Sequence, residues 1–462
     1  MNEREKLMKS FDAIILGFGK GGKTLAGTLA AADMSVAVVE RSEKMYGGTC
    51  INVGCIPSKS LITSAKSSAA AGGVFSERAA RYAEAVRERS RVVSLLRQKN
   101  FDKLTTHPKI TVLTGVAEFH DGRTVRIAFP DGSADTLTAP RIFINTGSRP
   151  FFPPIDGVQE SSHIYSSETL MSLETLPRRL VVIGAGYIGM EFAAMYANFG
   201  AQVTVIQDGA VFLPREDAEI AQTVLDRLKA MGVRRLFSAK VVRITDRNGF
   251  ADVLVETPEG DETLPAEAVL LATGRRPNAA ELHPERAGVA LTPRGAVQVD
   301  GHLRTTAPGI WAMGDVTGGL QFTYISLDDF RIVKSDVLGE GNRTSENRGA
   351  VPYSVFLDPP FSRVGLSEKE ALELGYDVSV FKLAASAIPK AQVLRETSGL
   401  LKAVVDRKTG RILGAHLFCA ESHEMINIIK LAMDASMPYT VLRDQIFTHP
   451  TMAEALNDLF TG

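Results

Sequence analysis

The sequence of 462 residues has only three cysteines, Cys50, Cys55 and Cys419. So few cysteines exclude a small secreted scaffold held together by disulfides. No apolar run reaches the roughly 18 residues of a membrane span, so we expect no membrane-spanning helix. The 52 basic and 53 acidic residues nearly cancel, and no net charge favours nucleic acid or an anionic membrane as a partner. The first ten residues lack the apolar segment of a signal peptide, so we expect a cytoplasmic protein.

A strand–turn–helix pattern near the start of the chain predicts a dinucleotide site. Residues 12–16 form a short apolar run, residues 17–22 read Gly-Phe-Gly-Lys-Gly-Gly, and a helical pattern follows to about residue 32. The next predicted strand, 35–39, ends at Glu40. In this arrangement glycines let the backbone approach a pyrophosphate at a helix N-terminus, and the acid accepts from ribose hydroxyls.

The same pattern recurs later in the chain. A predicted strand at 179–183 precedes Gly184-Ala185-Gly186-Tyr187-Ile188-Gly189, and a helix at 190–199 and a second strand at 202–206 follow. Two such units in one chain predict two dinucleotide sites, which suits an enzyme that moves electrons between two dinucleotides.

Cys50 and Cys55 lie close together, in the run Gly-Gly-Thr-Cys-Ile-Asn-Val-Gly-Cys-Ile-Pro-Ser-Lys that ends at Lys59. Two thiols beside a predicted cofactor site indicate a dithiol that cycles, because exchange needs one attacking and one resolving sulfur. Cys419 stands alone in an apolar strand pattern and is interpreted as a core residue.

The remaining segments indicate further domains. Two similar segments, 146–150 and 272–277, follow apolar strands with Gly-x-Arg-Pro patterns and are interpreted as paired crossings between domains. Beyond about residue 345, short strands at 353–356, 401–405 and 413–418 alternate with a helix at about 423–435, which predicts a separate α+β domain. The predicted fold is α/β, with two Rossmann-like dinucleotide-binding domains and a C-terminal α+β dimerisation domain.

Taken together, the two glycine motifs, the cysteine run, Met-Gly-Asp at 313–315 and Thr-His-Pro-Thr at 448–451 resemble the flavoprotein disulfide reductases over nearly the whole chain. The resemblance implies the domains 1–150 (FAD, first part), 151–270 (NAD(P)), 271–345 (FAD and central, second part) and 346–462 (dimerisation). It implies FAD as a cofactor, NADH or NADPH as the electron donor, and a homodimer that acts on a small acceptor.

The resemblance also assigns cofactor residues. Those implied to bind FAD are Gly17, Gly19, Gly22, Glu40, Gly48, Thr49, Lys59, Gly147 and Asp315, with Asp315 on the ribityl chain. Those implied to bind the nicotinamide coenzyme are Gly184, Gly186, Tyr187, Gly189, Gln207 and Gly274. Gln207 follows a strand after which an acid favours NADH and a basic residue favours NADPH, and it does neither. Asp208 weakly favours NADH and Arg215 could compensate, so the coenzyme stays open.

The catalytic residues implied by the resemblance are Cys50, Cys55, Lys59, Glu191, His449 and Glu454. Cys55 is implied to lie beside the flavin and Cys50 to exchange with the acceptor. Lys59 and Glu191 match an ion pair, and Tyr187 matches an aromatic gate. His449 and Glu454 match a pair that serves the partner subunit's site, where an imidazole takes the proton of the outer thiol.

A narrower resemblance concerns the acceptor. The segments 17–20, 212–217, 318–329 and 444–449 resemble the reactive-chlorine-resistance branch of the family, which implies reduction of Cu(II) bound transiently by Cys50 and Cys55. Two alternatives stay open: an organic disulfide reductase of the dihydrolipoamide dehydrogenase type, and a flavoprotein that senses oxidants without turnover.

Overall fold

The computed structural model describes residues 8–461, which divide into two compact units. Within that range, the first unit comprises 8–60, Val86–Phe151 and Gly274–Arg348, and the second comprises Leu61–Ala85, Phe152–Thr273 and 349–461. The helices α3 (Cys55–Ala71) and α4 (Phe75–Thr105) have residues in both units. Among the described residues, no helix is long and apolar enough to cross a membrane.

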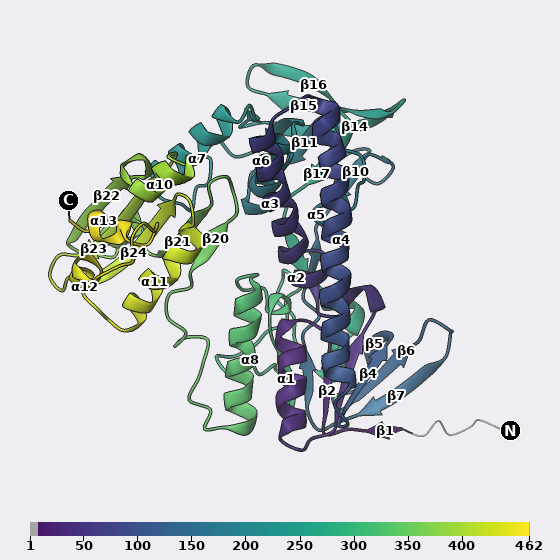
Figure 1. The fold of residues 1–462 in the computed structure, drawn as a ribbon. Coiled ribbons are helices and arrows are strands. Elements are labelled where there is room, and N and C mark those ends of the chain that lie inside the picture. The colour runs from purple at the N-terminus through teal and green to yellow at the C-terminus, as the bar shows by residue number, and fades with distance from the viewer. Residues whose placement is uncertain (1–7, 462) are drawn as a thin grey trace. The chain divides into compact units, whose positions relative to one another are not determined.

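The first unit is built on a five-stranded parallel sheet in the order β19-β8-β2-β3-β4. Its strands are β2 (Ala13–Leu16), β3 (Val36–Glu40), β4 (Ile110–Thr114), β8 (Ile142–Ile144) and β19 (Ile310–Ala312). The strands β2, β3 and β8 are buried along their whole length, as expected of parallel strands covered on both faces. Helix α1 (Lys20–Ala31) packs against β3 and against α8 (Thr323–Leu338), and Figure 1 shows these two helices side by side.

Smaller elements complete the first unit. They are the sheet β1-β7-β6-β5 (Lys9–Ser10, Ala134–Thr138, Thr124–Ala128, Val116–Phe119), the pair β9 (Ser148–Pro150) and β18 (Arg275–Pro277), and helix α2 (Thr49–Asn52). The segments β9 and β18 are the two Gly-x-Arg-Pro patterns, and they pair antiparallel with each other, Arg276 opposite Arg149.

The second unit holds the repeat of the first pattern. Its five-stranded parallel sheet has the order β10-β17-β11-β12-β13 (Ile164–Ser166, Ala268–Leu271, Arg179–Ile183, Gln202–Ile206, Arg234–Leu236). Three antiparallel strands, β14 (Lys240–Arg247), β15 (Phe250–Thr257) and β16 (Gly260–Ala266), form a further sheet. The helices of this part are α5 (Ser167–Leu170), α6 (Tyr187–Phe199) and α7 (Ala218–Ala230).

The C-terminal part of the second unit is an antiparallel sheet in the order β20-β21-β24-β23-β22 (Tyr353–Val355, Phe361–Gly365, Ile412–Phe418, Leu400–Asp406, Val378–Ala384). Its helices are α9 (Glu368–Glu373), α10 (Pro389–Leu394), α11 (Ser422–Asp434), α12 (Tyr439–Asp444) and α13 (Ala455–Leu459). The predicted fold class, two Rossmann-like units followed by an α+β domain, is confirmed, while the residue limits of the four predicted domains remain a prediction.

A buried lysine joins the C-terminal sheet to the N-terminus of α7. The side chain of Lys402 is 2% exposed, and its Nζ lies 2.7–2.8 Å from carboxylate oxygens of Asp217, Glu219 and Glu368. Asp217 also caps α7, because it accepts from the amides of Glu219 and Ile220. The last residue of the 212–217 motif therefore has a structural role in this ion network.

We expect Lys402→Ala to lower the free energy of unfolding by about 3 kcal/mol, because it leaves a buried carboxylate without its cation. Lys382→Ala is the matched control: Lys382 also binds Glu219, at 2.7 Å, but its side chain is 45% exposed, so the loss should stay below about 1 kcal/mol. Urea unfolding followed by circular dichroism measures both. Equal losses for the two variants would contradict the importance of burial here.

Candidate active site

The first glycine turn connects β2 to α1 in a conformation that requires glycine. Gly17 has φ +105°, and a Cβ there would lie 2.4 Å from the carbonyl oxygen of Asn145. The Asn145 side chain is buried: its Oδ1 accepts from the amide of Gly22 at 2.9 Å, and its Nδ2 donates to the carbonyl of Met313 at 2.7 Å. Asn145 thus ties the start of α1 to Met313, which follows β19 and lies two residues before Asp315.

Glu40 lies against this turn. Its Oε2 accepts from the amide of Phe18 at 3.0 Å, and its Oε1 accepts from the amide of Ser42 at 3.4 Å. Burial raises the pKa of Glu40, while the backbone amides oppose that shift. The carboxylate that the sequence assigned to a ribose is therefore at the glycine turn, at the end of β3.

Asp315 is brought to the same region by a second set of contacts. It begins a 3₁₀ turn, and its Oδ2 accepts from Ser148 Oγ at 2.7 Å. Ser148 in turn accepts from Arg275 Nε at 2.9 Å, across the β9–β18 pair. Burial raises the pKa of Asp315, and the amide of the preceding Gly314 donates to Asp329 at 2.7 Å. The Met-Gly-Asp turn is thus held from both sides.

The cysteine segment packs directly on the first glycine turn. Gly48 has φ +82°, and a Cβ there would lie 2.7 Å from Cα of Gly19. Cys50 lies in α2, immediately after this contact, and Cys55 is the first residue of α3. The fold therefore brings the predicted FAD turn and the predicted redox pair together.

Both cysteines are present as thiols, and they hydrogen-bond to each other. Thr323, the first residue of α8, lies with its Oγ1 3.5 Å from Cys55 Sγ and also hydrogen-bonds to Cys50. The pKa of Cys50 is raised, by its hydrogen bond with Cys55 and by burial; Thr323 and the cation of Lys23 offset only part of this rise. Cys50 is half-buried and Cys55 is exposed in the chain; which sulfur faces the flavin remains a prediction.

Two lysines lie near the pair. Lys59 is one turn after Cys55 on the same helix. Lys23 comes from α1; its Nζ donates to Asn100 Oδ1 at 2.6 Å and to the carbonyl of Gly47 at 3.2 Å. Burial lowers the pKa of Lys23 to about 8. Because Lys23 directly follows the glycine motif of residues 17–22, on its helix, the sequence pattern alone did not single it out.

We expect Thr323→Val to slow alkylation of the cysteine pair by iodoacetamide at pH 7 about fivefold, because one hydrogen bond to the thiolate is worth about 1 kcal/mol. Valine keeps the shape and removes the hydroxyl. Thr306→Val is a suitable control: its hydroxyl donates to the carbonyl of Gly288 in another loop of the same unit. Equal alkylation rates in wild type and Thr323→Val would show that the hydroxyl does not stabilise the thiolate.

The second glycine turn repeats the geometry of the first. Gly184 has φ +107°, and a Cβ there would lie 2.5 Å from the carbonyl oxygen of Ala272. A Cβ on Gly189 would lie 2.0 Å from the carbonyl oxygen of Gly184, whereas one on Gly186 would have no atom within 4 Å. The backbone at Gly186 is thus open to a ligand at the N-terminus of α6.

Helix α6 begins at Tyr187, three residues earlier than predicted, because the chain turns directly from Gly186 into the helix. Glu191 is therefore the fifth helical residue; it is buried, and its Oε1 accepts from the amide of Phe356 at 2.8 Å. Lys59 and Glu191 belong to different units, and their predicted ion pair remains a prediction.

Gln207 follows β12, as predicted, and uses both amide hydrogens within its own loop. Its Nε2 donates to the carbonyls of Gly209 and Val211, each at 2.9 Å. An amide held in this way can only accept at its oxygen. Gly274, which the sequence assigned to the coenzyme, lies in the first unit next to β18.

His449 and Glu454 form the predicted pair. Nδ1 of His449 lies 2.9 Å from Glu454 Oε2, and Glu454 Oε1 accepts from the amide of Thr451 at 3.1 Å. The hydrogen bond from His449 lowers the pKa of Glu454. The His449 side chain is 71% exposed within the chain, and Ile446 nearby is 99% exposed. The imidazole is therefore oriented by its own chain and presented outward.

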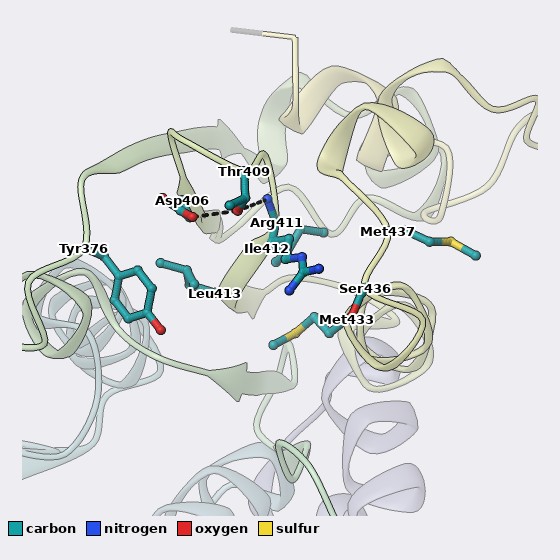
Figure 2. Close-up of a pocket in the computed structure, with 9 residues that line it drawn as sticks. All are labelled: Tyr376, Asp406, Thr409, Arg411, Ile412, Leu413, Met433, Ser436 and Met437. Atoms are coloured by element: carbon teal, nitrogen blue, oxygen red, sulfur yellow. Dashed lines mark hydrogen bonds between the residues drawn. The ribbon is translucent and has the colours of Figure 1, made fainter.

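The described residues contain a cavity away from the cysteines and glycine turns, but no cluster of candidate metal ligands. Residues 8–461 hold no group of three or more His, Cys, Asp or Glu side chains that could bind a metal ion. A cavity of about 380 Å³ lies beside β24; Figure 2 shows Tyr376, Arg411 and Met433 around it. The cavity shares no lining residue with the glycine turns, the cysteines or the His449–Glu454 pair.

Comparison with known proteins agrees with this geometry. Residues 11–329 match the family described as pyridine nucleotide-disulphide oxidoreductase, and residues 351–460 match its dimerisation domain. The chain is 49% identical to the probable pyridine nucleotide-disulfide oxidoreductase RclA of Escherichia coli K12, covering 98% of this chain and 99% of that protein. It is 34% identical to the dihydrolipoyl dehydrogenase of Mycobacterium bovis, covering 98% of both chains.

Other relatives span more than one activity. A mercuric reductase of Bacillus cereus is 33% identical over 96% of this chain and 70% of that protein. A solved structure, the Cu(II) complex of the HOCl-induced flavoprotein disulfide reductase RclA from Escherichia coli, superposes with a TM-score of 0.92 at 49% identity, covering 98% of this chain and 99% of that one. The chain therefore belongs to the pyridine nucleotide–disulphide oxidoreductases, a family of NAD(P)H-dependent flavoprotein enzymes.

Proposed function

We propose that the chain reduces Cu(II) to Cu(I) with electrons from a nicotinamide coenzyme, as part of a defence against reactive chlorine and oxidative stress. The observation that carries the proposal is the pair of hydrogen-bonded thiols, Cys50 and Cys55, contacted by Thr323 and lying near the cation of Lys23, which offsets part of the rise in the pKa of Cys50. Support also comes from the 49% identity to RclA, which has been solved as a Cu(II) complex.

The residues present fit FAD in the first unit. Gly17, Gly19 and Gly22 would hold its pyrophosphate, Glu40 a ribose and Asp315 the ribityl chain, with Gly48, Thr49, Lys59 and Gly147 as further contacts. The buried Asp315 carboxylate and the tight contact between Gly48 and Gly19 suit such a ligand. When bound, FAD would take a hydride from the coenzyme and pass the electron pair to sulfur.

The chemistry at the dithiol balances with two copper ions. Oxidation of the Cys50–Cys55 dithiol to a disulfide forms one S–S bond and releases two electrons and two protons. Two Cu(II) ions take one electron each and leave as Cu(I). Thiolates are soft ligands that favour Cu(I), so the product state is stabilised as the metal is reduced. Lys23 and Thr323 would favour the thiolate form that binds the metal.

An organic disulfide is the second candidate acceptor. The observation in its favour is the His449–Glu454 pair, because Glu454 orients Nδ1 of His449 and leaves Nε2 to exchange a proton. A leaving organic thiolate needs that proton, and a metal ion does not. We assign the pair to the partner subunit's site in a homodimer; the match to the dimerisation domain and the exposure of His449 support that assignment.

We assign NADH rather than NADPH as the preferred coenzyme of the second unit. Both amide hydrogens of Gln207 are donated within the loop, so its free oxygen suits ribose hydroxyls and would oppose a 2′-phosphate. Gly184, Gly186 and Gly189 would approach the coenzyme through their backbone. Tyr187, at the start of α6, is assigned as a side chain that moves aside when the nicotinamide binds.

An acceptor screen with purified holoenzyme tests the proposal. Anaerobic turnover is measured with Cu(II), lipoamide and glutathione disulfide, each with NADH and with NADPH. We expect the highest kcat/KM with Cu(II) and NADH. Turnover with lipoamide that exceeds turnover with Cu(II) would establish the organic disulfide reductase instead, and absence of turnover with every acceptor would leave a non-catalytic flavoprotein.

A further inference from the structure

One carboxylate of the 212–217 motif has a position that its sequence does not reveal. The Glu216 side chain is 1% exposed, and its two oxygens meet donors from three directions. Oε1 accepts from the phenol of Tyr353 at 2.7 Å and also from the phenol of Tyr187. Oε2 lies 3.4 Å from Nη1 of Arg363.

The donors come from two parts of the second unit. Tyr187 is the first residue of α6, directly after the open backbone of Gly186. Tyr353 and Arg363 lie opposite each other on β20 and β21 of the C-terminal sheet. The rings of Tyr187 and Tyr353 also pack, with centroids 5.6 Å apart. Glu216 therefore links the coenzyme turn to the C-terminal sheet.

Arg363 and Tyr353 are held more firmly in the structure than Tyr187 is. The Arg363 side chain is 9% exposed and also binds the carbonyl of Arg215 and the carboxylate of Glu370. Tyr353 packs edge-on against the buried ring of Phe361. Tyr187, by contrast, is half-buried at a helix end beside an open ligand site. Of the groups around Glu216, Tyr187 is the one that can leave without disrupting a sheet.

We infer that Glu216 is a positioning residue that holds Tyr187 closed at the coenzyme site, and that nicotinamide binding must break this hydrogen bond. The inference rests on the proposed coenzyme role of the Gly184–Gly189 turn. Burial and the Glu216 carboxylate raise the pKa of Tyr187 to about 12, so the phenol stays protonated and donates at physiological pH. Because the bond is charge-assisted, it is stronger than one between neutral groups.

The hydrogen bond between Tyr187 and Glu216, called the latch below, should weaken the apparent affinity for the coenzyme. If only the open position of Tyr187 admits the nicotinamide, the apparent Kd equals the intrinsic Kd divided by the open fraction. Weakening the bond raises that fraction and lowers the apparent Kd. The limiting rate of hydride transfer, measured once the coenzyme is bound, should change little. The expected signature is thus a change in Kd without a change in rate.

The test uses holoenzyme and 1,4,5,6-tetrahydro-NADH, a non-reducing coenzyme analogue, with Kd measured by calorimetry. Glu216→Gln keeps the size and removes the charge, and we expect about a fivefold lower Kd, the difference between a charged and a neutral hydrogen bond. Tyr187→Phe removes the same bond from its other end and should also lower the Kd. The double variant should show no additional effect, because both changes break one interaction.

Glu219→Gln is the matched control, since Glu219 lies three residues away and binds Lys382 and Lys402 instead. Its Kd should equal that of wild type. An unchanged Kd in Tyr187→Phe, or additive effects in the double variant, would overturn the latch, and Tyr187→Phe alone decides the matter if Glu216→Gln does not fold. Failure of the proposed function would be seen separately: the analogue would bind, but NADH would not reduce the flavin. If the analogue did not bind to wild type at all, both the proposed function and the inferred role of Glu216 would be overturned.

Discussion

Turnover with either Cu(II) or lipoamide should fall at least about a thousandfold in Cys50→Ser, on the scale seen when a catalytic nucleophile is removed. A serine hydroxyl cannot be oxidised to a disulfide, so the two-electron step between the sulfurs is lost. The same loss is expected for Cys55→Ser, because the pair acts as a unit: its sulfurs hydrogen-bond to each other and share Thr323.

The measurement is steady-state NADH oxidation with each acceptor, after the flavin content of each variant has been matched. Cys419→Ala is the control for loss of a cysteine. Cys419 is fully buried, lies against Met425, and has its pKa raised to about 12 by burial, so it is a poor nucleophile. Cu(II) reduction that persists in both serine variants would mean that electrons reach the metal without the dithiol.

The sequence predicted the parts of the site that are built from consecutive residues. The two glycine motifs could be recognised because each strand–turn–helix unit is local in sequence. The structure shows why glycine is required: Gly17 and Gly184 both have positive φ, and a Cβ on either would clash with a carbonyl oxygen. The Cys50–Cys55 pair, the register of Lys59 and the His449–Glu454 contact were predictable for the same reason.

The supporting residues could not be predicted, because their partners are distant in sequence. Asn145 meets Gly22 and Met313, more than a hundred residues away on either side. Glu216 belongs to a motif whose sequence is compatible with a surface loop, yet it is buried by Tyr353 and Arg363 from another sheet. Residues of this kind share no spacing rule, and only the packing of separate elements brings them together.

Lys23 could not be predicted from the sequence for a different reason. A lysine on the helix of a glycine motif is usually solvated, and no local feature distinguishes it from Lys20. The structure separates the two, because Nζ of Lys23 is bound by Asn100 and the carbonyl of Gly47, and burial lowers its pKa. The cation that opposes the rise in the pKa of Cys50 was therefore hidden beside a motif that had already been explained by phosphate binding.

The position of His449 leads to the last prediction, which separates the two candidate acceptors. We expect His449→Ala to lower lipoamide turnover by about a hundredfold or more, the usual contribution of a positioned acid–base group. Cu(II) reduction should stay within about threefold of wild type, because transfer of an electron to a metal held by sulfur leaves no thiolate to protonate.

Glu454→Gln provides the graded control, since it keeps a hydrogen-bond acceptor for His449 Nδ1 and removes the carboxylate charge. Its effect on lipoamide turnover should lie between wild type and His449→Ala, with Cu(II) reduction again unaffected. Sedimentation must first show that the dimer is intact, because the exposed loop of Ile446 and His449 is the part of the chain expected to reach the partner. If copper reduction falls as far as lipoamide reduction in an intact dimer, His449 has a role beyond proton transfer, and the separation of the two acceptors by chemistry is wrong.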